Sequence, residues 1–116
     1  MLDFPKTKRI EGGASLADTR TEIGGFLLTW DIEKEKLNRR KHGISFETAG
    51  RIFLDTERIE YYDVMHSIDE DRFVTIGLVD GLLSVVYTER EDDVLRLISA
   101  RKATDKERRA YERGQF

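Results

Sequence analysis

Two apolar segments separated by an Asp-Gly pair restrict the fold of this chain more than any other feature of its sequence. Residues 72–79 and 82–88 are rich in β-branched, aromatic and aliphatic side chains, and Asp80-Gly81 lies between them. Such segments favour strands, and a two-residue Asp-Gly linker favours the tight turn of an antiparallel hairpin. The sequence therefore predicts a β-hairpin and a domain that contains an antiparallel sheet.

The turn also predicts which side chains share a face of the hairpin. With a two-residue loop, Val79 pairs with Leu82, and the alternation of side chains then defines two faces. The face expected to pack in the core holds Arg72, Val74, Ile76, Leu78, Leu83, Val85 and Tyr87. The face expected to be open for binding holds Phe73, Thr75, Gly77, Ser84, Val86 and Thr88.

The flanking sequence predicts three more strands and three helices. The strands are expected at 26–30, 58–62 and 94–98, and the helices at 32–41, at 45–54 and from 105 onward. The first helix is expected to turn Leu37 toward the core, and the second to bury Phe46, Ala49, Ile52 and Phe53. The order β-α-α-β-β-β-β-α indicates an α+β domain with a four- to five-stranded, antiparallel-dominated sheet and helices packed on one face.

Particular residues mark where these helices begin and end. Asp31 and Ser45 precede the first two helices and are typical N-caps. Thr104 with Glu107 has the spacing of a capping box, and Gly43 is typical of the position just after a helix. The helix boundaries are therefore predicted independently of the hydrophobic pattern.

The composition is that of one soluble domain. The chain has 116 residues, 39% of them hydrophobic and 37% charged, and no cysteine; its mean hydropathy is −0.54. No segment approaches the roughly 20 apolar residues that a membrane-spanning helix needs. We expect a cytoplasmic protein with no membrane segment, in which residues 1–24 form a mobile tail and residues 25–116 a single domain.

Charges are segregated along the chain, although the formal net charge is only −3. Residues 31–51 contain six basic and four acidic residues, and residues 101–113 contain six basic and three acidic residues. Residues 55–71, between them, contain seven acidic residues and one arginine. Two basic segments that the fold brings together could hold a polyanion such as a nucleic acid.

Motifs of several large enzyme classes are absent. The sequence contains no GxGxxG, GxxxxGK[ST], GxSxG or HExxH, so nucleotide-phosphate loops, serine hydrolases and zinc peptidases have no support. His66 with Asp63 and Asp69 is a weak candidate for binding a cation, and a solvated acidic loop is the simpler interpretation. We expect neither a metal nor a cofactor.

A set of cationic and proton-transferring side chains remains. RNA cleavage can run on such a set, because the 2′-hydroxyl of RNA is itself the nucleophile. The protein must remove its proton, stabilise the charge on the phosphate and protonate the departing 5′-oxygen. The candidates are Lys34, Lys41, His42, His66, Arg72, Tyr87, Arg90, Arg96 and Arg101.

Ordinary structural roles stay open for several residues. An arginine is often a surface residue or an ion-pair partner, and His42 could bond the last carbonyls of its helix. Tyr87 falls on the predicted core face, which favours packing over catalysis. Trp30 and Phe26 could stack on RNA bases or close the edge of the core. The last helix carries a basic group that could hold phosphates or simply be solvated: Lys106, Arg108, Arg109 and Arg113.

Two strings in particular give the chain a resemblance to a known family. KHGISFE at 41–47 and ISARKA at 98–103 resemble motifs of the BrnT toxins, and the likeness extends over about residues 26–113. It implies a RelE-like fold and a metal-independent ribonuclease that inhibits translation. It also implies a BrnA antitoxin with a ribbon-helix-helix domain, through which alone operator DNA is bound. Asp69 stands where the family often has glycine.

The resemblance also implies roles for individual residues. Lys34, Lys41 and His42 match its first-helix motif, Arg72 and Arg90 its hairpin positions, and Arg101 the second string; strand alternation places Arg96 on the open face. We expect Lys34, Lys41, His42, Arg96 and Arg101 to be catalytic and Arg72, Arg90 and His66 to bind RNA. Two other classes stay open: a non-catalytic nucleic-acid-binding or regulatory domain, and a protein-interaction module.

Overall fold

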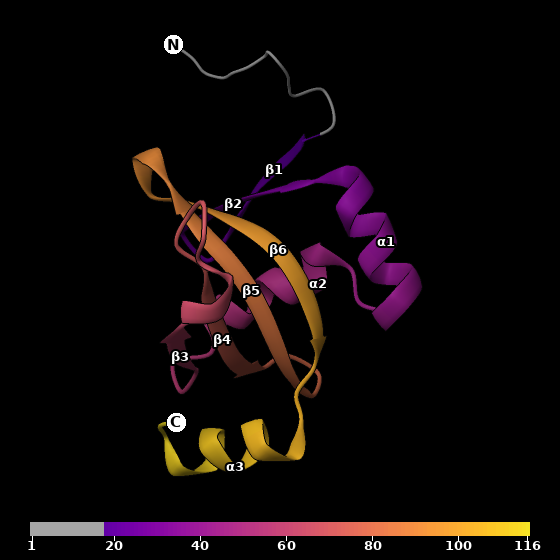
Figure 1. Cartoon of the computed structure of the whole chain (residues 1–116). Helices are drawn as coiled ribbons and strands as arrows, with labels where there is room; N and C mark the ends of the chain where they lie inside the picture. The colour runs from indigo at the N-terminus through magenta and orange to yellow at the C-terminus, as the bar shows by residue number, and fades with distance from the viewer. Residues whose placement is uncertain (1–17) are drawn as a thin grey trace.

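The computed structural model describes residues 18–116, which form a six-stranded sheet with helices on both faces (Figure 1). The elements are β1(Asp18–Ile23), β2(Phe26–Asp31), α1(Ile32–His42), α2(Phe46–Gly50), η2(Arg51–Leu54), β3(Ile59–Tyr62), η3(Val64–His66), β4(Phe73–Leu78), β5(Leu82–Arg90), η4(Glu91–Asp93), β6(Val94–Lys102) and α3(Asp105–Arg113). The strand order is β1-β2-β6-β5-β4-β3, and only the β2–β6 pair is parallel. The α+β class is confirmed. No helix within residues 18–116 is long and apolar enough to cross a membrane.

One strand more than expected joins the sheet. Residues 18–23, which the sequence analysis assigned to the tail, form β1 and pair with β2 in a hairpin. Its loop is Gly24-Gly25, with φ values of +58° and +90°, a conformation that glycine adopts without strain. The prediction of a four- to five-stranded sheet is therefore wrong, and so is the tail for residues 18–23. Residues 1–17, the remainder of the predicted tail, lie outside the described residues.

The predicted N-caps and the end of the first helix are confirmed, whereas the helix predicted at 45–54 is α-helical only to Gly50 and continues to Leu54 as the 3₁₀ helix η2. The side chains of Asp31 and Ser45 each accept hydrogen bonds from backbone N–H groups of the helix that follows. Gly43 ends α1 with a φ of +73°, and its N–H donates to the Arg39 carbonyl. Thr104 and Glu107 form both bonds of a capping box. These features depend only on neighbouring residues, which is why the sequence was sufficient to predict them.

The β4–β5 hairpin differs from the prediction by one residue. Leu78 pairs with Leu82, so the loop has three residues, Val79, Asp80 and Gly81. A shift of one residue moves every side chain of a strand to the other face. Phe73, Thr75 and Gly77 therefore share a face with Leu83, Val85 and Tyr87, whereas Arg72, Val74, Ile76 and Leu78 belong to the opposite face.

The larger core lies between the sheet and the helices α2 and η2. We call the face of the sheet that these helices cover the inner face. Phe46, Ala49, Ile52 and Phe53 are buried, as the helical pattern predicted. Tyr87 stacks on Phe73 at 5.6 Å between ring centroids, which confirms its packing role. The core role of Trp30 and Phe26 is also confirmed.

The opposite face, which we call the outer face, is partly covered by α3. Ala110 of this helix packs with Ile59, Val74 and Ile76 in a second, smaller core. The expectation that the helices pack on one face is wrong for this reason: the shifted register turns Val74 and Ile76 outward, where they need cover. In Figure 1, α2 passes behind β5 and β6, while α3 lies below the lower end of the sheet.

Helix α1 packs against the sheet through polar side chains. Glu35 and Asn38 are its buried residues, and Leu37, expected to face the core, is 58% exposed. Glu35 accepts a hydrogen bond from the Phe46 N–H, and Asn38 bonds to the main chain of β6 at Ala100. These contacts place α1 alongside β6 (Figure 1).

Candidate nucleic-acid interface

Arginines from several elements lie on the outer face of the sheet. Arg96 on β6 pairs with Thr88 on β5, and Arg101 pairs with Ser84. Residues paired across neighbouring strands share a face, as do residues two apart in one strand. By this register the area, which we call the arginine face, is formed by Arg20, Arg72, Arg90, Arg96 and Arg101.

An irregularity in the β5–β6 ladder is needed for this arrangement. Arg96 and Arg101 are five residues apart, so simple alternation would put them on opposite faces. The register shifts between Val86 and Tyr87, and the extra residue in β6 restores Arg101 to the outer face. Arg20 was missed by the sequence analysis because it was assigned to the tail.

Carboxylates from other elements hold three of these arginines. Arg96 donates to both oxygens of Asp18 on β1 at 3.0 and 3.2 Å, and Arg90 lies 3.1 Å from Glu70. Arg101 donates to both oxygens of Glu107 on α3 at 2.9 Å. Such bidentate pairs fix the plane of a guanidinium, and five N–H donors leave some free for a phosphate.

The Arg101–Glu107 pair is charged and partly buried. The Glu107 side chain is only 11% exposed. Burial acts to raise its pKa, but hydrogen bonds from Arg101 and the Thr104 N–H outweigh burial, and the pKa is lowered. The hydrogen bond to Glu107 raises the pKa of Arg101. Glu107 therefore holds Arg101 as a fixed cation; the sequence identified this glutamate only as a capping residue.

Tyr61 on β3 belongs to the same electrostatic environment. Burial, followed by the charges of Glu107 and Asp63, raises the pKa of its phenol. Tyr61 also lies close enough to Arg101 for its charge to act on that guanidinium. A protonated hydroxyl and a fixed cation thus share the outer face. Nothing in the sequence around Tyr61 indicated this, because Glu107 and Arg101 are more than 35 residues away along the chain.

The candidates on α1 are exposed and border this face. Lys34, Lys41 and His42 are all at the surface of the helix. They lie about one turn on either side of Asn38, which contacts the edge of β6 at Ala100. The next residue in β6 is Arg101, on the outer face. Within residues 18–116, the His42 side chain makes no hydrogen bond, and no hydrogen bond or ion pair joins these three residues to the arginines.

His66 lies in η3, next to Ser67, whose hydroxyl accepts a hydrogen bond from the Arg72 N–H. Its Nδ1 is 2.9 Å from an Asp63 oxygen, and its side chain is 70% exposed. In the part of the chain that the structure describes, no three His, Cys, Asp or Glu side chains gather closely enough to hold a metal ion. The cation site considered for His66, Asp63 and Asp69 is therefore not formed.

The chain is similar to known proteins in both sequence and fold. A sequence model of the family described as "Ribonuclease toxin, BrnT, of type II toxin-antitoxin system" matches residues 30–107. The fold is similar to that of the ribonuclease toxin BrnT of Brucella abortus, with a TM-score of 0.50 and 25% sequence identity over 66% of this chain and 94% of that one. No curated protein matches the chain. The matched residues include α1, β3 to β6 and Glu107.

Proposed function

Because the chain belongs to the BrnT family of ribonuclease toxins of type II toxin-antitoxin systems, we propose that it cleaves RNA without a metal ion and so inhibits translation. The arginine face is the observation that carries the proposal. Three of its five guanidinium groups are held by carboxylates, and all five lie on one face of the sheet in a chain of net charge −3. RNA phosphates are the ligands that such a surface attracts.

The reaction needs no nucleophile from the protein. The 2′-oxygen of RNA attacks the adjacent phosphorus, the bond to the 5′-oxygen breaks, and a 2′,3′-cyclic phosphate remains. Arg96 and Arg101 stabilise the additional negative charge on the phosphate oxygens. Arg72 and Arg90 bind the neighbouring phosphates of the RNA. His66 binds a further phosphate along the RNA strand.

Proton transfer is assigned to α1. The proton of the 2′-hydroxyl passes to a base, and the departing 5′-oxygen receives one. His42 suits this exchange because an imidazole nitrogen can accept a proton and also donate one. Lys34 and Lys41 add positive charge at the edge of β6. The supporting observation is that these three residues border the arginine face without being tied to other side chains among the described residues.

A toxin of this kind needs a partner that masks it. We propose that this partner is a BrnA-type antitoxin with a ribbon-helix-helix domain. The complex binds operator DNA only through this domain of the antitoxin. The surface covered would include Lys34, Lys41, Arg96 and Arg101. Ribbon-helix-helix domains dimerise to read DNA, so the complex should contain an even number of toxins. The RNA substrate implies action in the cytoplasm.

The test is cleavage of RNA by the purified full chain in excess EDTA. We expect 2′,3′-cyclic phosphate ends and a loss of at least tenfold in rate for Arg96→Ala and Arg101→Ala. The matched control is Arg51→Ala. Arg51 is an exposed arginine of η2 on the inner side of the sheet, so this variant should cleave RNA normally. Induction of the chain alone should stop growth. Folded protein that accumulates while growth and RNA stay normal would refute the proposal; RNA that is protected but not shortened would indicate a non-catalytic binding domain.

A further inference from the structure

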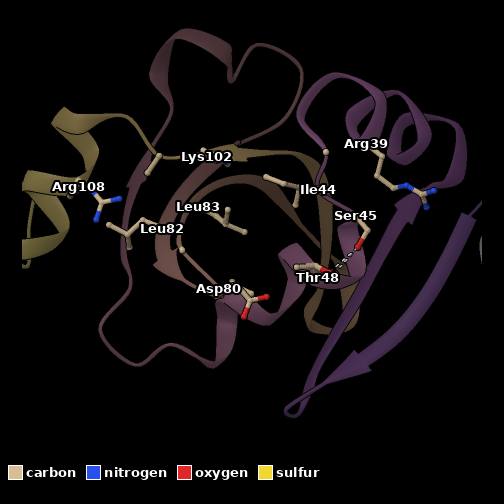
Figure 2. Close-up of a pocket in the computed structure, with 13 residues that line it drawn as sticks. Arg39, Ile44, Ser45, Thr48, Asp80, Leu82, Leu83, Lys102 and Arg108 are labelled. Atoms are coloured by element: carbon tan, nitrogen blue, oxygen red, sulfur yellow. Dashed lines mark hydrogen bonds between the residues drawn. The ribbon is translucent and has the colours of Figure 1, made fainter.

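A concave site lies outside the arginine face, at the other end of the β5–β6 ladder from Arg90. It is a pocket of about 600 Å³ between the end of α1, the β4–β5 loop and the start of α3 (Figure 2). This volume is within the range of about 300 to 1,000 Å³ typical of ligand sites. Lys102 lines it, whereas its neighbour Arg101 belongs to the outer face.

Positive charge predominates in this pocket. Arg39 and Arg108 lie on opposite sides of it in Figure 2, and Lys102 is the third cation. Lys102 and Arg108 form no side-chain ion pair within residues 18–116, and Arg39 has only Glu35 at 3.6 Å. The single acidic lining residue, Asp80, is 90% exposed. The pocket therefore favours a ligand that carries more than one negative charge.

Aliphatic side chains also line the pocket: Ile44, Val79, Leu82 and Leu83. Leu82 and Leu83 are buried, whereas Ile44 and Val79 are only partly buried. No aromatic side chain is among the lining residues, so an RNA base has no ring to stack on. An aliphatic side chain placed against Ile44 and Val79, in contrast, would remove apolar surface from water. A ligand that fits this pocket therefore carries carboxylates for the cations and aliphatic groups for the apolar lining. An acidic, amphipathic peptide has both.

We propose that this pocket anchors an acidic, amphipathic segment of the antitoxin. Its carboxylates contact Arg39, Lys102 and Arg108, and its aliphatic side chains cover Ile44 and Val79. The inference rests on the proposed function, which supplies the partner. Because Lys102 and Arg101 are consecutive residues on opposite sides of β6, a segment held here lies beside the arginine face without occupying it. Anchoring and masking of the RNA-binding surface are thus separate contacts.

The first experiment measures binding in the absence of RNA. The full ¹⁵N-labelled chain is titrated with an acetylated hexapeptide of glutamate and leucine, and in parallel with hexauridylate. We expect the peptide to shift the amide signals of Ile44, Leu82 and Leu83. The double variant Lys102→Glu with Arg108→Glu should lower peptide affinity at least tenfold. Arg113→Glu, on α3 but outside the pocket lining, should bind as the unmodified chain does.

The second experiment uses the cognate antitoxin in cells. The double variant should stay toxic when the antitoxin is coexpressed, while its RNA cleavage and thermal unfolding match those of the unmodified chain. Hexauridylate shifting the pocket amides in place of the peptide would overturn the inference, as would full neutralisation of the double variant. Failure of the unmodified chain to cleave RNA would count against the proposed function alone, because peptide binding is measured without cleavage.

Discussion

Asn38 supplies to Ala100 the two hydrogen bonds that a neighbouring strand would otherwise provide. Its Nδ2 donates to the Ala100 carbonyl at 2.9 Å, and its Oδ1 accepts from the Ala100 N–H at 3.0 Å. Strand β2 pairs with β6 only from Val94 to Arg96, so the edge of β6 beyond this point has no strand beside it. The amide therefore attaches α1 to the sheet and satisfies buried backbone groups.

Replacing Asn38 should destabilise the fold. In Asn38→Ala the N–H and carbonyl of Ala100 lose their partners while they remain buried, so we expect the free energy of unfolding to fall by about 2 to 4 kcal/mol. Denaturant unfolding measures this change. The control is Leu37→Ala, the adjacent exposed residue, whose effect should stay within about 0.5 kcal/mol. Equal losses in the two variants would contradict the role given to Asn38.

Gly77 and Gly81 provide a test of the hairpin register. A Cβ on Gly77 would lie 2.6 Å from Ile52 Cγ1, whereas one on Gly81 would meet nothing within 4 Å. Gly77→Ala should therefore lower the free energy of unfolding by about 1 to 3 kcal/mol, and Gly81→Ala by less than about 0.5 kcal/mol. In the two-residue-loop register Gly77 would face the open side and tolerate alanine, so an unchanged midpoint of denaturation for Gly77→Ala would argue against the observed register.

The Tyr111–Asp55 hydrogen bond should make stability depend on alkaline pH. The bond, 2.7 Å long, and then burial raise the pKa of Tyr111 to about 12. A raised pKa means that the neutral phenol is favoured by folding, so this contribution is complete below about pH 10, the ordinary tyrosine value, and is lost as the pH rises through 12. Unfolding of the unmodified chain and of Tyr111→Phe at several pH values measures it. The difference in stability should be constant up to about pH 10 and then shrink; a constant difference at pH 12 would contradict this assignment.

Arg101 should not be replaceable by lysine. A lysine keeps the charge but cannot make the two parallel bonds to Glu107, so the cation would no longer be held in position. We expect Arg101→Lys to reduce RNA cleavage at least tenfold while folding is retained. Glu107→Gln should reduce cleavage as well, because it removes the partner charge. Arg113→Lys is the control on α3, and single-turnover cleavage rates compare the three. Normal cleavage by Arg101→Lys would mean that charge alone is sufficient.

Features that depend on nearby residues could be predicted from the sequence. The caps at Asp31, Ser45 and Thr104 and the buried stripe of α2 were all correct, because each follows from interactions within a few residues. The α+β class followed from the same local patterns. Arg96 was placed correctly on the same face as Thr88, because alternation within one strand is also a local property.

The family resemblance, the helix caps and the class of fold were thus determined by the sequence alone, since all of them lie in short strings of residues. Only the tertiary structure decided which partners meet across long separations. Asp18 reaches Arg96 across 78 residues, a three-residue loop turns Val74 and Ile76 toward α3, and a ladder irregularity brings Arg101 beside Arg96. The physical reason is that register and ion pairing depend on how distant segments compete to bury apolar surface and satisfy charges, and no local pattern records the outcome of that competition.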